Sequence, residues 1–243
     1  MKVGILANPN KDRIDQIIQN LCESLQRENL TPVLETETAK LIDAGDGVEA
    51  SELAKICDLV AVLGGDGTML NAANQLGPAD IPVAGINVGT LGFLTTCTDS
   101  ELDVFAKAVA GKDYTLIERM QLRATIISAN GEKKSFRALN EVTLARGQTG
   151  RLVELDAWVD GELLNHYRAD GLIVATTTGS TAYSLSAGGP LIAPKAEVFV
   201  ITPICPHSLS NRSLVVSHNS LVELAPAKNA ECPMFLTVDG RDV

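Results

Sequence analysis

The fold is decided by the stretch Leu59-Val60-Ala61-Val62-Leu63-Gly64-Gly65-Asp66-Gly67-Thr68. It opens with an apolar run that is too short for a helix and ends at glycine, so this run predicts a buried strand. Asp66 then stands among glycines at the carboxyl end of the strand, where open α/β sheets bind their ligands. The stretch therefore predicts an α/β sheet with a candidate site at its edge.

The glycine turn indicates phosphate chemistry. Gly64, Gly65 and Gly67 leave no side chain between the main chain and a phosphate, and glycine reaches backbone angles that are closed to other residues. A carboxylate among phosphate-binding amides repels phosphate unless it holds a metal or takes a proton. Asp66 therefore indicates phosphoryl transfer rather than passive binding. The alternative is an ordinary tight turn capped by Asp66.

Outward from this turn, strands alternate with helices. Apolar patterns predict strands at residues 3–7, 33–34, 59–63 and 83–86, and helices at residues 14–25, 50–56, 69–75 and 101–110, with Gly111 as the last C-cap. This alternation is typical of a parallel sheet. We therefore predict an amino-terminal Rossmann-like α/β domain over residues 1–116.

Beyond residue 116 the pattern changes to short runs separated by hairpin signals such as Asn130-Gly131 and Asp160-Gly161. The predicted strands are residues 122–127, 136–144, 152–159, 172–175, 198–201, 214–216, 221–224 and 235–238. They indicate a β-rich carboxyl-terminal domain over residues 117–243. A short connection between the domains predicts a ligand cleft beside it.

Composition excludes several classes of protein. The formal net charge is -10 and only 4% of residues are aromatic, which opposes nucleic-acid binding. An acidic enzyme that handles polyanions needs local positive charge or Mg²⁺. No apolar run approaches the length of a membrane span and the amino terminus does not resemble a signal peptide, so no membrane partner is expected. The cysteines are scattered without a CxxC pair, which favours a reducing cytoplasmic location over disulfides or zinc.

A second polar constellation lies in the β-rich part. Asp170 precedes an apolar strand that runs into the hydroxyl- and glycine-rich residues 176–190. Small hydroxyls and amides at a helix start donate hydrogen bonds to anions, and Tyr183 can stack on a base or bond a ribose. Upstream, Asn140-Glu141 places an amide beside a carboxylate, a combination that bonds the edge of adenine or the diol of a ribose. The alternative for this pair is an ordinary polar turn.

Together these segments resemble the NAD kinase family, which phosphorylates the 2′-hydroxyl of the adenosine ribose of NAD to give NADP. The donor in that family is ATP or, in some members, polyphosphate. The matching segments cover nearly the whole chain and comprise residues 64–68, 91–94, 118–120, 139–142, 170–190 and 203–212. The resemblance implies a cytoplasmic NAD kinase that binds NAD and ATP in its β-rich domain and glycine turn. It also implies a need for Mg²⁺ or another divalent cation, and a homodimer or homotetramer.

The resemblance further implies roles for single residues. Asp66 is the implied catalytic base, and it also contacts the dinucleotide. The other implied NAD- or ATP-binding residues are Gly64, Gly65, Gly67, Thr68, Phe93, Asn140, Glu141, Arg151, Arg168, Asp170, Thr181, Ala182, Tyr183, Ser184, Leu185 and Ser186. For Phe93 the alternative is core packing, and for Arg151 it is a solvated surface charge. The arginines are suited to phosphate because guanidinium offers a bidentate fork. No metal ligand is assigned.

Two rival functions stay open at this point. A lipid kinase shares the glycine turn but has no need for the block of residues 181–186. A nucleotide-binding regulator without catalysis binds NAD and produces no NADP. Two departures from the family pattern are Thr177, where proline is frequent, and Arg241, where glutamine is common; the family also usually continues beyond the residue at which this chain stops.

Overall fold

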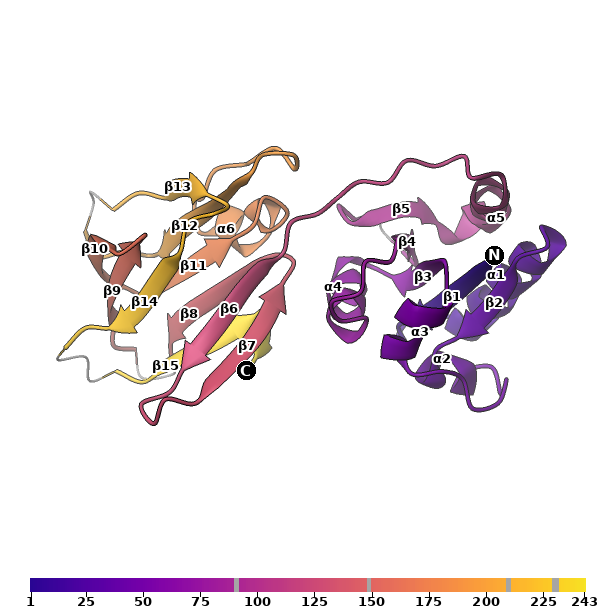
Figure 1. Ribbon diagram of the computed structural model, residues 1–243, viewed down its shortest axis with the longest axis horizontal. Coiled ribbons are helices and arrows are strands. Elements are labelled where there is room, and N and C mark those ends of the chain that lie inside the picture. The colour runs from indigo at the N-terminus through magenta and orange to yellow at the C-terminus, as the bar shows by residue number, and fades with distance from the viewer. Residues whose placement is uncertain (90–91, 148–149, 209–210, 229–231) are drawn as a thin grey trace. The chain divides into compact units, whose positions relative to one another are not determined.

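The computed structural model (Figure 1) describes residues 1–89, 92–147, 150–208, 211–228 and 232–243. These residues fall into two units, Met1–Ile117 (unit 1) and Glu118–Val243 (unit 2). The predicted cleft beside the connection stays a prediction.

The described residues of unit 1 form a parallel sheet in the order β2-β1-β3-β4-β5. Its strands are β1 (Lys2–Ala7), β2 (Thr31–Leu34), β3 (Leu59–Gly64), β4 (Val83–Asn87) and β5 (Thr95–Thr98). The helices are α1 (Ile14–Arg27), α2 (Thr36–Lys40), α3 (Ala50–Ile56), α4 (Asp66–Gln75) and α5 (Leu102–Gly111), with a 3₁₀ turn η1 (Asp99–Glu101) before α5. The predicted α/β alternation is confirmed.

Both faces of this sheet are covered, which explains why β1 and β3 are apolar along their whole length. Val3 and Ile5 of β1 pack in one cluster with α1 and α5. Leu6, which points to the opposite face, packs with α3 and α4. Successive side chains of a strand alternate between faces, so one continuous apolar run supplies both cores.

The strand order places a topological switch point between β1 and β3, since the chain winds to opposite sides from there. Ligands in doubly wound folds bind outside the carboxyl ends of the strands at this point. The two ends lie together here: the Asn8 N–H donates to the Leu63 carbonyl at 2.9 Å, and Asn8 Nδ2 donates to Thr68 Oγ1 at 3.2 Å. The glycine turn therefore occupies the expected crevice.

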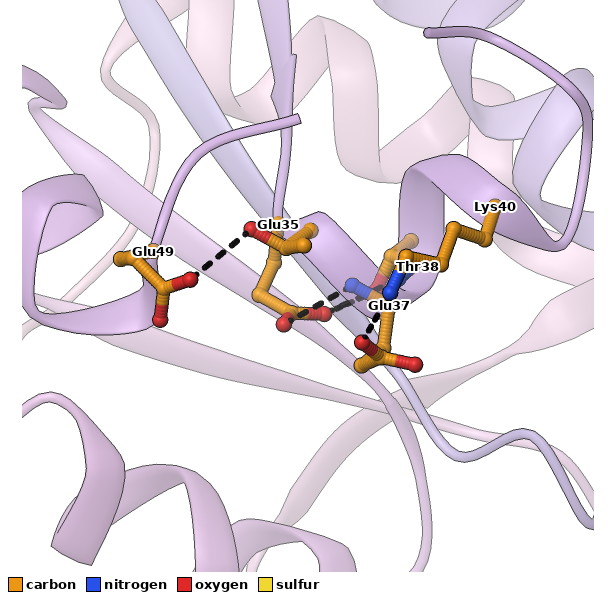
Figure 2. Close-up of polar contacts among 6 residues, drawn as sticks. Glu35, Glu37, Thr38, Lys40 and Glu49 are labelled. Carbon is orange, nitrogen blue, oxygen red and sulfur yellow. Dashed lines mark hydrogen bonds and ion pairs between the residues drawn. The ribbon is translucent and has the colours of Figure 1, made fainter. Parts of the chain in front are cut away.

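A polar cluster around α2 secures the end of β1. The Glu35 carboxylate caps this helix by accepting from the N–H groups of Glu37 and Thr38 at 3.0 and 2.9 Å, as Figure 2 shows. Thr38 Oγ1 in turn accepts from the buried N–H of Ala7 at 2.9 Å. Lys40 pairs with Glu37 on the exposed side of the helix. The last backbone donor of β1 is thereby satisfied beside the switch point.

Two helix predictions in unit 1 need correction, and two short elements were missed. Helix α4 starts at Asp66 rather than Met69, because extended Gly65 is the N-cap and Asp66 occupies the first turn. Helix α5 includes Gly111, and its C-cap is Lys112 in the left-handed conformation at φ 55°. The short elements α2 and β5 were not predicted, since neither carries a periodic apolar pattern.

The described residues of unit 2 form antiparallel sheets in the orders β13-β12-β11-β8-β15-β16, β10-β9-β14 and β6-β7. The strands are β6 (Leu122–Ile127), β7 (Lys133–Ala138), β8 (Glu141–Arg146), β9 (Val153–Val159), β10 (Glu162–Ala169), β11 (Gly171–Ala175), β12 (Val198–Ile204), β13 (Leu214–Ser217), β14 (Val222–Pro226), β15 (Met234–Val238) and β16 (Arg241–Asp242). Two short helical segments, η2 (Gly179–Thr181) and α6 (Tyr183–Ser186), follow β11. The predicted β-rich class is confirmed.

Strand β11 contributes to separate cores of unit 2. Leu172 of β11 packs with β9 and β10, whereas Val174 packs with β6, β7 and β15. One prediction here was wrong: residues 136–144 are not one strand but parts of β7 and β8, which are separated by a turn at Leu139 and Asn140. Strand β10 was missed because polar residues interrupt its alternation.

Candidate active site

Asp66 lies in the first turn of α4, directly after β3. Its half-buried carboxylate is held from outside the helix: Oδ2 accepts from the Phe93 N–H at 3.0 Å and Oδ1 from the Leu94 N–H at 2.9 Å. A carboxylate is favourable at this end of a helix because the helix dipole is positive there. These contacts orient both oxygens of Asp66.

Two of the glycines around Asp66, Gly64 and Gly92, are needed for space and not for unusual backbone angles. Gly64, Gly65 and Gly67 do not have positive φ angles. A Cβ on Gly64 would lie 2.2 Å from Thr68 Oγ1, and a Cβ on Gly92 would lie 2.2 Å from Asp66 Oδ1. A Cβ on Gly65 or Gly67 would meet no atom within 4 Å. Gly64 and Gly92 therefore permit close packing, whereas Gly65 and Gly67 leave the main chain open to a ligand.

Phe93 is positioned as an exposed aromatic. Its side chain is 76% exposed, which contradicts the core-packing alternative. Its N–H binds Asp66, so the ring projects from the same short segment that holds the carboxylate. Leu91, which belongs to the same sequence motif, lies outside the described residues.

In unit 2 the predicted pair Asn140-Glu141 meets the segment that follows β11. The Thr176 N–H donates to the Asn140 carbonyl at 2.8 Å, and Thr176 Oγ1 donates to the Leu139 carbonyl at 2.6 Å. A Cβ on Gly179 would lie 2.1 Å from the Asn140 carbonyl oxygen, so only glycine fits there. The structure thus brings together two motifs that are more than thirty residues apart.

Glu141 has an unusual environment for a carboxylate. The residue is only 7% exposed, and its Oε2 atom is buried without a hydrogen-bond partner among the described residues, as is Thr178 Oγ1. Burial raises the pKa of Glu141 to about 7, and the negative charge of Asp239 adds to the effect. Both protonation states are therefore populated near neutral pH. Unpaired buried polar atoms of this kind suit a ligand that supplies the missing partner.

The block of residues 181–186 uses several of its hydroxyls internally. Thr181 Oγ1 donates to the Thr178 carbonyl at 3.0 Å, and buried Ser184 Oγ lies 2.9 Å from Thr202 Oγ1. These two hydroxyls were predicted as ligand donors, but in this structure they stabilise the turn. Tyr183, Leu185 and Ser186 are exposed.

A cavity of about 800 Å³ in unit 2 brings Asp170 and Tyr183 to one place. Arg146, Ile204 and Phe235 also line it, so its walls combine charge with two aromatic rings. Arg146 Nε donates to Asp170 Oδ1 at 2.6 Å. Sequence reasoning missed Arg146, because it ends a strand and carries no motif.

The two predicted arginines lie elsewhere. Arg168 is on β10, with an exposed side chain whose Nε is 3.6 Å from Glu154 Oε1. Arg151 is exposed before β9, and its carbonyl accepts from Cys232 Sγ. Neither residue lines the cavity that Asp170 and Tyr183 share.

No group of three or more His, Cys, Asp or Glu residues that could hold a metal ion occurs in the described part of the chain. Mg²⁺ is commonly held by one or two carboxylates together with substrate phosphates and water, so the absence of such a group does not conflict with it. Asp66 is the carboxylate that fits, since each of its oxygens keeps acceptor capacity beyond one N–H. Among these same residues, no helix has both the length and the apolar character to cross a membrane.

Most of the chain matches two models of one protein family. Residues 3–114 match the ATP-NAD kinase N-terminal domain, and residues 139–243 match the ATP-NAD kinase C-terminal domain. The sequence is 40% identical over 240 residues to the NAD kinase of Natranaerobius thermophilus, covering 98% of this chain and 84% of that protein. It is 43% identical over 242 residues to the NAD kinase of Chlorobium limicola, covering 99% and 83%.

Two solved structures share the fold. Yeast NADH kinase complexed with NADH superimposes with a TM-score of 0.91 and 28% identity, covering 100% of this chain and 74% of that chain. An NAD kinase from Archaeoglobus fulgidus in complex with ATP gives a TM-score of 0.79 and 27% identity, covering 100% and 86%.

Proposed function

Because the chain belongs to the NAD kinase family and is thus a phosphotransferase, we propose that it phosphorylates the 2′-hydroxyl of the adenosine ribose of NAD, with ATP as donor, to give NADP. The observation that carries this proposal is the carboxylate of Asp66, held by two backbone N–H groups beside a glycine turn at the switch point. Open backbone at Gly65 and Gly67 supports phosphate contact there.

In the proposed reaction Asp66 acts as the general base. It takes the proton of the 2′-hydroxyl while that oxygen bonds to the γ-phosphorus of ATP, and the bond from phosphorus to the bridging oxygen of ADP breaks. The N–H groups of Phe93 and Leu94 fix the direction of the carboxylate, and the exposed ring of Phe93 offers a surface for adenosine. Positioning supplies most of the rate enhancement in phosphoryl transfer.

Unit 2 supplies recognition in this proposal. Asn140 and Glu141 bind NAD through hydrogen bonds, and the buried Oε2 of Glu141 accepts a ribose hydroxyl or, when protonated, donates to an acceptor. Asp170 and Tyr183 bind a further part of a nucleotide in their common cavity. Exposed Leu185 and Ser186 and half-buried Ala182 complete the proposed binding surface, and Arg151 and Arg168 contribute positive charge.

The donor and the cation are also part of the proposal. A relative from Archaeoglobus fulgidus was solved with ATP, which supports ATP over polyphosphate as donor here. Mg²⁺ or another divalent cation, when bound, would neutralise charge on the phosphates; it would be held by those phosphates, by water and by the oxygen of Asp66 that does not take the proton.

The cellular location is proposed from the cysteines, and the oligomeric state from the family. The five cysteines are scattered along the sequence without a CxxC pair, which supports a reducing, cytoplasmic compartment. We also propose a homodimer or homotetramer on the basis of the family resemblance. Size-exclusion chromatography with light scattering measures the assembly directly.

The experiment that tests the function follows NADP with an NADP-specific dehydrogenase. Purified protein is incubated with NAD and MgATP, and separately with NAD, MgCl₂ and polyphosphate. NADP formation with MgATP supports the proposal, and formation only with polyphosphate replaces the donor. Tight NAD binding in calorimetry without formation of NADP would instead support a nucleotide-binding regulator without catalysis. A further assay with NADH in place of NAD tests whether the reduced dinucleotide is also phosphorylated.

A further inference from the structure

Asp239 makes an unusual set of contacts with a turn that is about a hundred residues away in the sequence. Its Oδ2 accepts from the Leu139 N–H at 2.9 Å, while Oδ1 accepts from Asn140 at 2.8 Å and from Glu141 at 3.2 Å. The Asp239 N–H donates to the Glu141 carbonyl at 2.9 Å. Three consecutive N–H groups that converge on one anion form a nest. Here the anion is a side chain of the protein itself.

The backbone at Asp239 is built for this contact. Asp239 and Gly240 have φ angles of 48° and 73°, and they form the two-residue turn between β15 and β16, where Val238 pairs with Arg241. Two positive φ angles are typical of a type I′ hairpin turn, for which Asp-Gly is a preferred sequence. The turn directs the carboxylate toward the start of β8 rather than into solvent, because β15 is the neighbour of β8 in the sheet.

The contacted turn carries the proposed NAD-binding pair. Leu139 and Asn140 connect β7 to Glu141 at the start of β8, and the carbonyl groups of these two residues already accept from Thr176 on the other side. Asp239 satisfies the N–H groups of the same residues, so the turn is held from both sides. We propose that Asp239 is a positioning residue for NAD binding, which holds the Leu139 to Glu141 turn so that Asn140 and Glu141 face the ligand. This inference rests on the proposed role of that pair.

The same carboxylate also acts on Glu141 through its charge. Of the elements that flank β8 here, β11 places uncharged Ala175 opposite Glu141, and the β15–β16 turn places Asp239 beside it. Asp239 is the charged group that raises the pKa of Glu141 further after burial itself, within the described residues. Removal of this charge should therefore lower the pKa of Glu141, because the ionised form would no longer be repelled.

The test compares two Asp-Gly hairpins within unit 2. Asp160 and Gly161 have φ angles of 53° and 85° in the turn between β9 and β10, and Asp160 Oδ1 accepts from the Leu221 N–H at 2.8 Å. Asp160→Asn is therefore a matched control that changes the same residue in the same kind of turn. Asn tolerates the left-handed conformation, so neither Asp→Asn variant should strain its turn.

We expect Asp239→Asn to raise KM for NAD about 10- to 100-fold and to change kcat less than about threefold. The amide keeps one oxygen for Asn140 and Glu141, but its NH₂ group opposes the Leu139 N–H. Asp160→Asn should leave KM for NAD unchanged even where it lowers the melting temperature equally. An equal KM in the two variants, or a loss confined to kcat, overturns the proposal.

A second variant separates geometry from charge and serves if Asp239→Asn does not fold. Asp239→Glu keeps the charge but adds a methylene, so it cannot reproduce all three hydrogen bonds. We expect it to raise KM for NAD without moving the inflection near pH 7 in the pH profile of KM, whereas Asp239→Asn should move this inflection to lower pH. If Asp239 had only a structural role, the inflection near pH 7 would stay in place in both variants. Wild-type protein that forms no NADP contradicts the proposed function instead, so the two failures are distinguishable.

Discussion

Asp66 in unit 1 and Glu141 in unit 2 are both carboxylates at the end of a sheet strand, yet their environments are opposite. Asp66 is half-buried and each of its oxygens accepts a backbone N–H, from Phe93 and Leu94. Glu141 is nearly fully buried, keeps one oxygen without a partner, and has a pKa raised to about 7. The two acids share a chemical group but cannot share a role.

The difference in environment indicates that the two carboxylates have different tasks. Two carboxylates in environments that differ in burial and hydrogen bonding are a common arrangement in which each group takes a different task. The held, accessible carboxylate of Asp66 suits proton transfer. The buried carboxyl of Glu141 suits recognition, because a ligand can satisfy the oxygen that the protein leaves unpaired.

The largest expected effect tests the catalytic half of this comparison. Asp66→Asn should lower kcat by about 10² to 10⁴, the usual scale for loss of a general base, and leave NAD binding intact. Steady-state kinetics and calorimetry measure the two quantities. Asp80→Asn, at an exposed site in the same unit, is the control. Near-normal turnover in a folded Asp66→Asn variant would remove Asp66 as the base.

The second effect is on stability and concerns Glu141. A Glu carboxyl ordinarily has a pKa of 4.5, and in the folded protein this value is about 7. The stability contributed by the protonated carboxyl is thus fully present below about pH 4.5 and is lost as pH rises through about 7. The free energy of unfolding of Glu141→Gln should equal that of the wild type at about pH 4 and exceed it by about 3 kcal/mol at about pH 8.

Urea unfolding at both pH values checks this prediction. Glu223→Gln, the same substitution at an exposed site on β14, is the control. If wild type and Glu141→Gln differed in stability by the same amount at both pH values, Glu141 would titrate normally. Asp66 and Glu141 would then differ only in burial and hydrogen bonding, not in pKa.

The third effect tests how tightly Asp66 is held. A Cβ on Gly92 would lie 2.2 Å from Asp66 Oδ1, so Gly92→Ala must displace the carboxylate or the segment that binds it. We expect kcat to fall about 10²-fold, since a misplacement of about 1 Å costs that much in positioned catalysis. Gly111→Ala, at a site where a Cβ meets nothing within 4 Å, should keep full activity. A fully active Gly92→Ala enzyme argues against a fixed base.

The smallest effect sharpens the recognition half. Tyr183 is 45% exposed at the cavity with Asp170, so Tyr183→Ala should weaken NAD by about 1 to 3 kcal/mol, as expected for loss of a stacking face. Ser186→Ala should cost less, because it removes one exposed hydroxyl. Calorimetry with Tyr183→Phe separates ring from hydroxyl. If none of the three variants shifts the dissociation constant, the block of residues 181–186 is structural.

Much of the fold followed from local patterns. The apolar run before Gly64 forms a strand that contributes to the cores on both faces of the sheet of unit 1, because a strand covered on both faces needs apolar residues throughout. The helix Ala50–Ile56 and the strand Leu122–Ile127 have the predicted bounds. Boundaries were wrong where no side-chain period marks them, as in the turn at Leu139 and Asn140. The motif residues of the candidate site could be named from the resemblance to a family, but their contacts could not.

The sequence by itself determined the alternation of strands and helices, the glycine turn and the change to β-rich structure, since these depend on periodicity and turn residues within a few positions. Only the tertiary structure decided which atoms meet. It placed the N–H groups of Phe93 and Leu94 on Asp66, Arg146 on Asp170, and Asp239 under the turn that carries Glu141. It also turned Ser184 inward to Thr202. Such pairs are set by strand order and register over long sequence separations, and no local pattern encodes them.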